Sequence, residues 1–243
     1  MRVDFYKDEL EMGKAEAEHL VDIINSKEHP VICVPAGQSC ICMFNELVKM
    51  YKEGKVDFDK VKFVGLDEWY DCKQYEGTAR WILDTTFLNE INLNEDNCRF
   101  FNTNAEDPEK ECQEVEKFIE DNGGLDYIAL GVGMNGHVAL NEPGVDLTLG
   151  AHVNTLAEKT KEVSEKYFEN GMPDLKKGLT LGYKNIFEAR EIVVFINGER
   201  KVPIFEKFMK TPVTNEFPVT NIKTSSKARM VVDLAASKNI YVE

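Results

Sequence analysis

The sequence predicts an α/β fold with a mostly parallel central sheet. Its 243 residues suit one large domain with a substantial core. Short apolar runs alternate with segments of helical spacing, the pattern of strands joined by right-handed helical crossovers. Polar or glycine-rich residues follow several runs, as they do at the carboxyl edge of an open sheet. No internal repeat or linker interrupts the pattern, so residues 1–243 are predicted to form a single domain.

The first elements alternate between helix and strand. Apolar residues recur at helical spacing from Glu9 to Ile24, which predicts an amphipathic helix. The apolar run that begins at Val31 predicts a strand ended by a Pro-Ala-Gly turn. Helical spacing resumes from Ser39 to Lys52, and Val61 to Leu66 (VKFVGL) predicts a second strand with Asp67 just past its end.

The middle of the chain continues the alternation. Thr78 to Asn89 and Pro108 to Asp121 are expected to be helical. The short segment from Cys98 to Phe101 is interpreted as a strand between them. Leu125 to Leu130 (LDYIAL) is apolar and leads into a glycine-rich turn, so it is expected to be a buried strand.

The last part contains one unusual segment. Val153 to Lys177 is polar, charged and weakly periodic, and it fits either a lid spanning about residues 148–177 or a surface helix. Beyond it, Glu191 to Ile196 (EIVVFI) predicts a buried strand, Lys201 to Met209 a helix, and Ala228 to Leu234 the last strand.

The charge balance narrows the classes of partner. The chain carries 29 basic and 43 acidic residues, a net charge of −14. Nucleic acid and anionic membranes require basic surface, so neither is expected as a partner. A small anionic substrate needs only a local cluster of donors and is not excluded. The N-terminal segment lacks a signal peptide's apolar core, so a cytoplasmic location is expected.

The cysteines point to no metal or redox centre. None of the six forms a Cys-x-x-Cys pair, so no zinc site is predicted. In a reducing cytosol, free thiols that pack as small apolar groups are the favoured interpretation.

The stretch from Gly131 to Gly144 (GVGMNGHVALNEPG) carries the densest set of chemical groups. Its glycines match G-x-G-x-x-G, but no long helix can follow, because Asn-Glu-Pro-Gly soon breaks the chain. A nicotinamide site is therefore disfavoured. His137 can exchange a proton near neutral pH, and Asn135 and Glu142 are close enough in sequence to orient its ring.

Two further clusters follow predicted strands. A turn with free backbone amides and a hydroxyl can hold a phosphate, although an ordinary capped turn explains it equally well. The residues of this turn are Pro35, Ala36, Gly37, Gln38 and Ser39. Asp67 and Glu68 form the second cluster. A carboxylate there can move a proton beside a carbonyl, and solvated loop acids are the plain alternative.

These strings together resemble the glucosamine-6-phosphate deaminase family of amino-sugar-phosphate isomerases. The matching strings are PAGQS, GLDEW, GVGMNGHVALNEPG, GLTLGYKNI and NGERK, in order from about Val31 to Lys201. The resemblance implies a Rossmann-like three-layer sandwich with a peripheral lid. It also implies conversion of a 2-amino-2-deoxyhexose 6-phosphate to a ketose 6-phosphate and ammonia, without a cofactor.

The resemblance also implies roles for particular residues. His137, with Glu142 beside it, would assist opening of the sugar ring, and Asp67 would move the C2 proton to C1. The phosphate would lie on the Gly37 to Ser39 turn with Lys201, and Lys161 best matches the lid's cation. Ala36, Gln38, Glu68 and Gly136 complete the expected substrate contacts.

Asn135 departs from the glucosamine-type pattern, which has aspartate before Gly-His. An amide can accept a hydrogen bond from the imidazole N–H, but it cannot supply a charge that stabilises imidazolium. We therefore expect a less basic His137. The combination of Leu-Asp-Glu-Trp with Asn-Gly-His is more similar to the galactosamine-6-phosphate branch, which would prefer a sugar with an axial C4 hydroxyl.

Two other functions stay open on the sequence. A 6-phosphogluconolactonase has a related Gly-His turn, but lactone hydrolysis leaves the Asp67-Glu68 pair unused. A non-catalytic sugar-phosphate sensor would keep the phosphate turn and lose catalytic groups, whereas Asp67 and His137 remain. The expected partner is a small sugar phosphate, and the resemblance is also compatible with a homo-oligomer.

Overall fold

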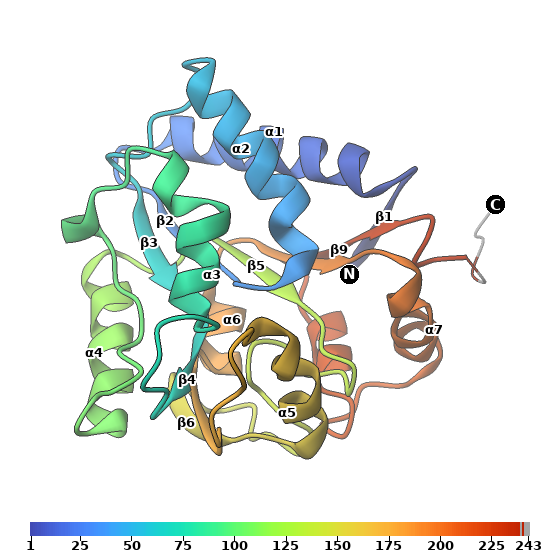
Figure 1. Ribbon diagram of the computed structural model, residues 1–243. Helices are drawn as coiled ribbons and strands as arrows, with labels where there is room; N and C mark the ends of the chain where they lie inside the picture. The colour runs from blue at the N-terminus through green and yellow to red at the C-terminus, as the bar shows by residue number, and fades with distance from the viewer. Residues whose placement is uncertain (239, 241–243) are drawn as a thin grey trace.

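A six-stranded sheet forms the centre of the molecule. The computed structural model describes residues 1–238 and 240, and every neighbouring pair in this sheet is parallel (Figure 1). In sheet order the strands are β1 (Arg2–Tyr6), β9 (Ala228–Asp233), β8 (Ile192–Ile196), β5 (Tyr127–Gly131), β2 (Val31–Val34) and β3 (Lys62–Gly65). The predicted α/β class with a parallel central sheet is confirmed.

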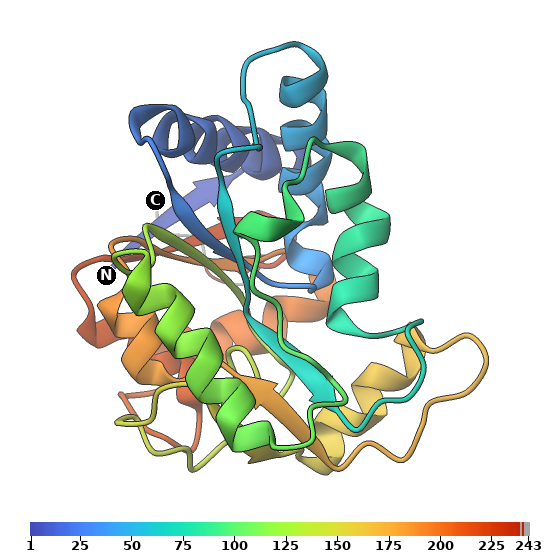
Figure 2. The same cartoon turned by 90° about the vertical axis from the view of Figure 1, so that its left-hand side faces the viewer.

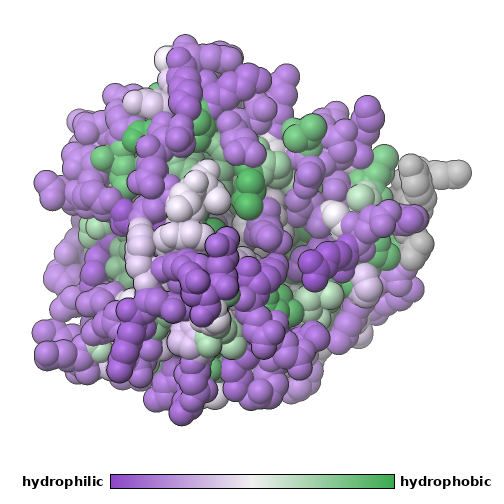
Figure 3. Space-filling view, in the orientation of Figure 1, coloured by the Kyte–Doolittle hydropathy of each residue, from purple (hydrophilic) through white to green (hydrophobic). Residues whose placement is uncertain are grey.

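Helices cover both faces of this sheet, which gives three layers (Figure 2). One face packs against α1 (Glu9–Ser26), α2 (Ile41–Lys52) and α3 (Ala79–Thr86). The other packs against α4 (Pro108–Asp121), α6 (Tyr183–Glu188) and α7 (Val202–Lys210). Strand β2 shows why two cores form, because Ile32 enters the first core and Cys33 the second. The outer surface in Figure 3 is mostly hydrophilic.

Side-chain caps begin several helices where the sequence places Asp or Thr. The Asp8 carboxylate accepts from the Glu11 N–H at the start of α1. Thr78 accepts from the Trp81 N–H before α3, and Asp107 caps α4, whose first residue is Pro108. Short 3₁₀ segments occur at Gln38–Cys40, Leu88–Glu90, Glu95–Asn97, Glu165–Tyr167, Glu199–Lys201 and Pro218–Thr224.

A small antiparallel sheet lies beside the carboxyl end of the large one. It consists of β4 (Asp67–Tyr70), β7 (Lys177–Thr180) and β6 (His152–Thr155), in that order. Helix α5 (Glu158–Ser164) lies between β6 and β7 in the chain and below α3 in the view of Figure 1. Only Leu66 separates β3 from β4, so the chain passes directly from one sheet to the other.

Three expectations about these segments need correction. The sequence predicts Asp67 in a loop past a strand end, but it begins β4 and pairs with Thr180. The expected strand from Cys98 to Phe101 is a single bridge between Arg99 and Val64. The segment from Val153 to Lys177 contains both a strand and helix α5, and not one surface helix. Among the residues described, no helix has the length and apolar character needed to span a membrane.

Candidate active site

An open cleft at the carboxyl end of the parallel strands contains most of the predicted site residues. It encloses about 1050 Å³ of empty space, part of which is continuous with solvent. Its walls come from the turn after β2, the start of β4, the turn after β5, and α5. The predicted residues that line it are Ala36, Gly37, Gln38, Ser39, Asp67, Glu68, Asn135, His137 and Lys201. Gly136, Glu142 and Lys161 do not line it.

Asp67 is the carboxylate that faces the cleft without a partner. No hydrogen bond to its side chain is found among the described residues, whereas its backbone is held in β4. Burial, and then the charge of Glu68, raises the pKa of Asp67 from 3.8 to about 7. A carboxylate whose pKa lies near neutral pH is suited to general-base catalysis.

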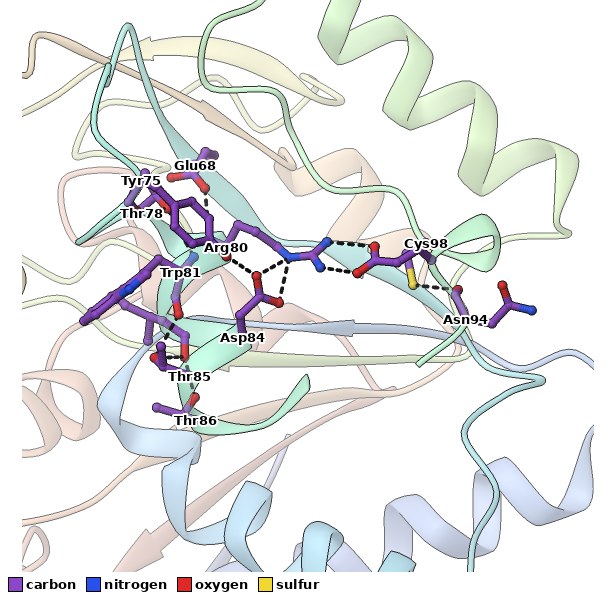
Figure 4. Close-up of polar contacts among 12 residues, drawn as sticks. Glu68, Tyr75, Thr78, Arg80, Trp81, Asp84, Thr85, Thr86, Asn94 and Cys98 are labelled. Carbon is purple, nitrogen blue, oxygen red and sulfur yellow. Dashed lines mark hydrogen bonds and ion pairs between the residues drawn. The ribbon is translucent and has the colours of Figure 1, made fainter. Parts of the chain in front are cut away.

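Glu68 points to backbone amides and serves as an anchor for the next segment. Its carboxylate accepts from the N–H groups of Trp69 (2.8 Å), Ala79 (2.9 Å) and Arg80 (3.0 Å). Burial raises the pKa of Glu68 to about 7, against the opposing effect of these amides. The Arg80 guanidinium bonds Asp84, one turn further along α3, at 2.8 Å and Glu95, outside the helix, at 3.1 Å (Figure 4). Both oxygens of Glu68 are therefore engaged by the chain, although the sequence suggested a substrate contact.

Two glycines shape the turn that carries His137. A Cβ on Gly133 would lie 2.3 Å from His137 Nε2, so only glycine leaves room for the imidazole. Gly136 has φ 88° and a side chain there would overlap the ring of Phe217, at 2.2 Å. No helix follows β5 before β6, as the Asn-Glu-Pro-Gly break predicts. The glycines therefore let this turn fold closely around His137 and against Phe217.

Glu142 lies behind His137 and is 6% exposed. Its Oε2 accepts from Asn135 Nδ2 (2.7 Å) and lies 3.3 Å from His137 Nδ1. Its Oε1 accepts from the Thr160 hydroxyl (2.5 Å) and the Ala157 N–H (3.2 Å). Although burial acts to raise it, the charge and hydrogen bonds of His137, with those of Thr160 and Asn135, lower the pKa of Glu142 to about 2.

The contacts of Asn135 differ from those that the sequence suggested. Its Oδ1 accepts from the backbone N–H of His137 at 3.2 Å, and not from the imidazole. Its amide donates to Glu142, so Asn135 positions that carboxylate. The negative charge beside the imidazole comes from Glu142, whose Oε2 lies 3.3 Å from His137 Nδ1.

We expect Asn135→Asp to destabilise the protein near neutral pH. Two carboxylates would then meet where the amide now donates to Glu142 at 2.7 Å. Like charges at this distance raise one pKa, and we expect a loss of about 1–3 kcal/mol of unfolding free energy at pH 7.5. The loss should shrink below about pH 5, as the pair takes up a proton. Urea unfolding at both pH values measures it, and equal stability with wild type at pH 7.5 would contradict this role for Asn135.

A cluster of cations lies at the other end of the cleft. Lys201 Nζ donates to the Val132 carbonyl, and Lys166 Nζ lies 3.1 Å from Gln38 Oε1. Burial, then the charges of Lys166 and Arg200, lowers the pKa of Lys201 to about 8. Lys166 and Lys201 line the cleft with the Gly37 turn, and no carboxylate pairs with either in the described part of the chain, so both present unneutralised positive charge there. This arrangement favours an anion.

Two lid lysines, Lys159 and Lys166, line the cleft, whereas Lys161, which the sequence suggested, does not. Lys159 pairs with Glu162 at 2.8 Å, so Lys166 is the lid cation in the cleft that no carboxylate pairs with among the described residues. Lys161 forms an ion pair with Glu158 on the surface of α5. Sequence reasoning also missed a stripe of lid residues that line the cleft, Thr160, Val163, Ser164 and Tyr167. Their spacing of i, i+3, i+4 and i+7 is the signal of a helix with one covered face. The charged residues between these positions make the helical spacing hard to recognise in the sequence.

The remaining candidate groups give no second centre. All six cysteines are free, and five of them are buried. Among the residues described, no three His, Cys, Asp or Glu side chains gather so as to hold a metal ion.

Comparisons with known proteins place the chain in a family. The family model for glucosamine-6-phosphate isomerases and 6-phosphogluconolactonase matches residues 9–232. The glucosamine-6-phosphate deaminase of Clostridium perfringens (strain 13 / Type A) is 33% identical over 239 residues, covering 98% of this chain and 99% of the relative. That of Thermoanaerobacter sp. (strain X514) is 31% identical over 231 residues, covering 95% and 91%.

The fold leads to the same group of proteins. The solved structure of a monomeric glucosamine-6-phosphate deaminase superposes with a TM-score of 0.92 at 25% identity, covering 98% of this chain and 99% of that one. The chain therefore belongs to the glucosamine-6-phosphate isomerase and 6-phosphogluconolactonase family.

Proposed function

We propose that this protein is an enzyme that isomerises and deaminates a 2-amino-2-deoxyhexose 6-phosphate, giving a ketose 6-phosphate and ammonia. The observation that carries the proposal is the position of Asp67. Its unpartnered carboxylate, with a pKa raised to about 7, lines the same cleft as an imidazole and a cluster of unpaired cations. These are the base, the ring-opening group and the anion anchor that the reaction needs.

Each of these groups carries out a separate step of the proposed reaction. The imidazole of His137 exchanges a proton with the sugar's ring oxygen, which opens the pyranose to the aldehyde. Asp67 removes the proton at C2 and returns it at C1, while the amine gives up one proton and O1 takes one up, so that the aldehyde becomes an alcohol and C2 an imine. Water adds to the C2 imine, and the carbinolamine expels ammonia to leave the ketone. Atoms balance with one water consumed, and no electron acceptor is required.

The phosphate anchors the other end of the substrate. The amides of the Gly37–Ser39 turn donate to its oxygens, and Lys166 and Lys201 supply positive charge. This anchor fixes the distance of C1 and C2 from the phosphate and so presents them to Asp67. Lactone hydrolysis needs no base at C2, and a sensor needs no catalytic carboxylate, so Asp67 favours the isomerase and deaminase over both.

Ammonia release by the purified protein tests the proposal. Galactosamine 6-phosphate and glucosamine 6-phosphate are supplied separately, and 6-phosphogluconolactone is supplied in a parallel assay. We expect release from at least one amino sugar and propose a preference for galactosamine 6-phosphate, on the basis of Asn135. Faster turnover of glucosamine 6-phosphate would overturn that preference alone. Binding without release, or lactone hydrolysis alone, would overturn the deaminase proposal.

Replacement of Lys161 and of Lys166 by alanine tests which of the two binds the phosphate. We expect Lys166→Ala to raise KM for the sugar phosphate by about 10- to 100-fold, because one charge-assisted contact to the phosphate is lost. Lys161→Ala is the matched control, since Lys161 pairs with Glu158 outside the cleft. Steady-state kinetics of both variants provide the measurement. A larger rise in KM for Lys161→Ala than for Lys166→Ala would reverse the assignment.

We also propose a cytoplasmic location. The six free thiols suit a reducing compartment, where cysteines do not pair. The sequence is also compatible with a homo-oligomer, and light scattering of the purified protein measures whether one forms.

A further inference from the structure

The lid contacts two parts of the cleft at once. Helix α5 and the 3₁₀ turn Glu165–Tyr167 form one continuous helical segment. Near its start, Thr160 is 6% exposed and its hydroxyl contacts both Glu142 and His137. Near its end, Lys166 contacts Gln38 in the proposed phosphate turn. A short helical segment therefore joins the two sites.

The hydroxyl of Thr160 can donate only one hydrogen. The carboxylate Oε1 of Glu142, at 2.5 Å, is the stronger acceptor and takes it. The Thr160 oxygen then offers a lone pair to His137 Nδ1 at 3.2 Å. Glu142 Oε2 is also an acceptor beside the same nitrogen, at 3.3 Å. Both neighbours of Nδ1 thus accept, so Nδ1 carries a hydrogen and Nε2 is left to exchange a proton with the substrate.

The two oxygens of Glu142 are held by different parts of the chain. Oε2 is bound by Asn135 and His137, which belong to the glycine turn. Oε1 is bound by Thr160 and by the Ala157 N–H, which belong to the lid segment. A displaced lid would leave Oε1 without these donors and Nδ1 without one acceptor.

We propose that Thr160 is a positioning residue that makes ring opening depend on a lid seated over the substrate's phosphate. Attraction of Lys166 to the phosphate holds the lid segment, and the same segment places the Thr160 hydroxyl between Glu142 and His137. The proton-exchanging form of His137 is then assembled only while the lid segment is seated, and the bound phosphate favours that position. This inference rests on the proposed function and adds a residue and a coupling to it.

Thr160→Val keeps the shape of the side chain and removes the hydroxyl. We expect kcat for ammonia release to fall at least about tenfold while KM changes less than about threefold, because the phosphate anchor is intact. Thr160→Ser restores the hydroxyl and should recover kcat to within about threefold of wild type. Thr155→Val, at an exposed position of β6, is the matched control and should behave as wild type.

Two measurements separate positioning from a general structural effect. A reduced, open-chain analogue, 2-amino-2-deoxyglucitol 6-phosphate, needs no ring opening, so calorimetry should give Thr160→Val the same affinity for it as wild type. In a double-mutant cycle, Thr160→Val and Lys166→Ala should lower kcat less together than the product of their separate effects. If Thr160→Val does not fold, the comparison of Thr160→Ser and Thr160→Ala carries the same test.

The outcomes distinguish this inference from the proposed function. Wild-type protein that releases no ammonia overturns both. If wild type is active, three results overturn only the coupling by Thr160. These are a Thr160→Val variant as active as wild type, a Thr160→Val variant changed in KM alone, and independent effects of Thr160→Val and Lys166→Ala on kcat.

Discussion

Asp67→Asn is expected to abolish most turnover and, at the same time, to stabilise the protein. Loss of the base at C2 should lower kcat by about 10²- to 10⁴-fold. The carboxylate lies in the cleft with no hydrogen bond to it among the described residues, and burial raises its pKa to about 7. Ionisation of this group is therefore unfavourable in the folded state, and an amide removes that cost.

The sign of the stability effect follows from proton binding. Between pH 3.8, the ordinary pKa of an aspartate, and about pH 7, the folded protein holds a proton on Asp67 that the unfolded chain has lost. Unfolding free energy thus falls as pH rises through this range. We expect Asp67→Asn to match wild type below about pH 4 and to be more stable by about 1–3 kcal/mol at pH 8.

Urea unfolding at pH 4 and pH 8, with ammonia release at each pH, measures both effects. Asp59→Asn, at an exposed position, is the control and should change neither quantity. Substantial activity in Asp67→Asn would remove Asp67 from its role as base. Lower stability than wild type at pH 8 would show that the carboxylate is held by interactions stronger than the cost of burying it.

Glu142→Gln is expected to have the opposite effect on stability and also to lower turnover. Burial acts to raise the pKa of this carboxylate, but the contacts of His137, Thr160 and Asn135 lower it from 4.5 to about 2, so they favour its charged form. A glutamine cannot accept at both ends, because its amide nitrogen is a donor and would face Asn135 or Thr160. We expect a loss of about 1–3 kcal/mol at pH 7, and kcat reduced about 10²-fold or more.

The pH dependence distinguishes this site from Asp67. Glu142 contributes stability that is fully present above pH 4.5 and is lost as pH falls towards 2. The difference between wild type and Glu142→Gln should therefore decrease over that range. Glu28→Gln serves as the control because its side chain is 92% exposed. A pH-independent difference would indicate a packing defect and not the loss of a stabilised charge.

The central sheet could be predicted because its strands are buried on both faces. Val31–Val34, Tyr127–Gly131 and Ile192–Ile196 read as apolar runs for that reason. The edge strand Arg2–Tyr6 is half exposed and has only one neighbour, so its mixed run does not indicate a strand. Asp67–Tyr70 gives no strand signal either, because its polar side chains line a cleft, where function and not burial sets the residue types.

The sequence predicts which residue types form the candidate site, but it does not predict most of the contacts between them. The sequence places Asp67, His137 and the Gly37 turn after predicted parallel strands, whose carboxyl ends share one edge of the sheet. All three line the same cleft in the structure. Which partner Asn135 bonds depends on where Glu142 lies after the turn folds back, and local spacing does not specify that. Lys166 lies far along the chain from the residues it meets, so only the packing of α5 identifies it.

The single residue between β3 and β4 also has a consequence for substrate size. The Gly37 turn of the proposed phosphate anchor follows β2 of the large sheet, Asp67 begins β4 of the small sheet, and Leu66 alone joins β3 to β4. With the roles proposed for these groups, the angle between the sheets sets how long a sugar must be to reach from the anchor to Asp67. Substitutions that alter packing at this junction, as at Gly65 against Phe100, would shift preference between sugars of different chain length without any change in the catalytic groups.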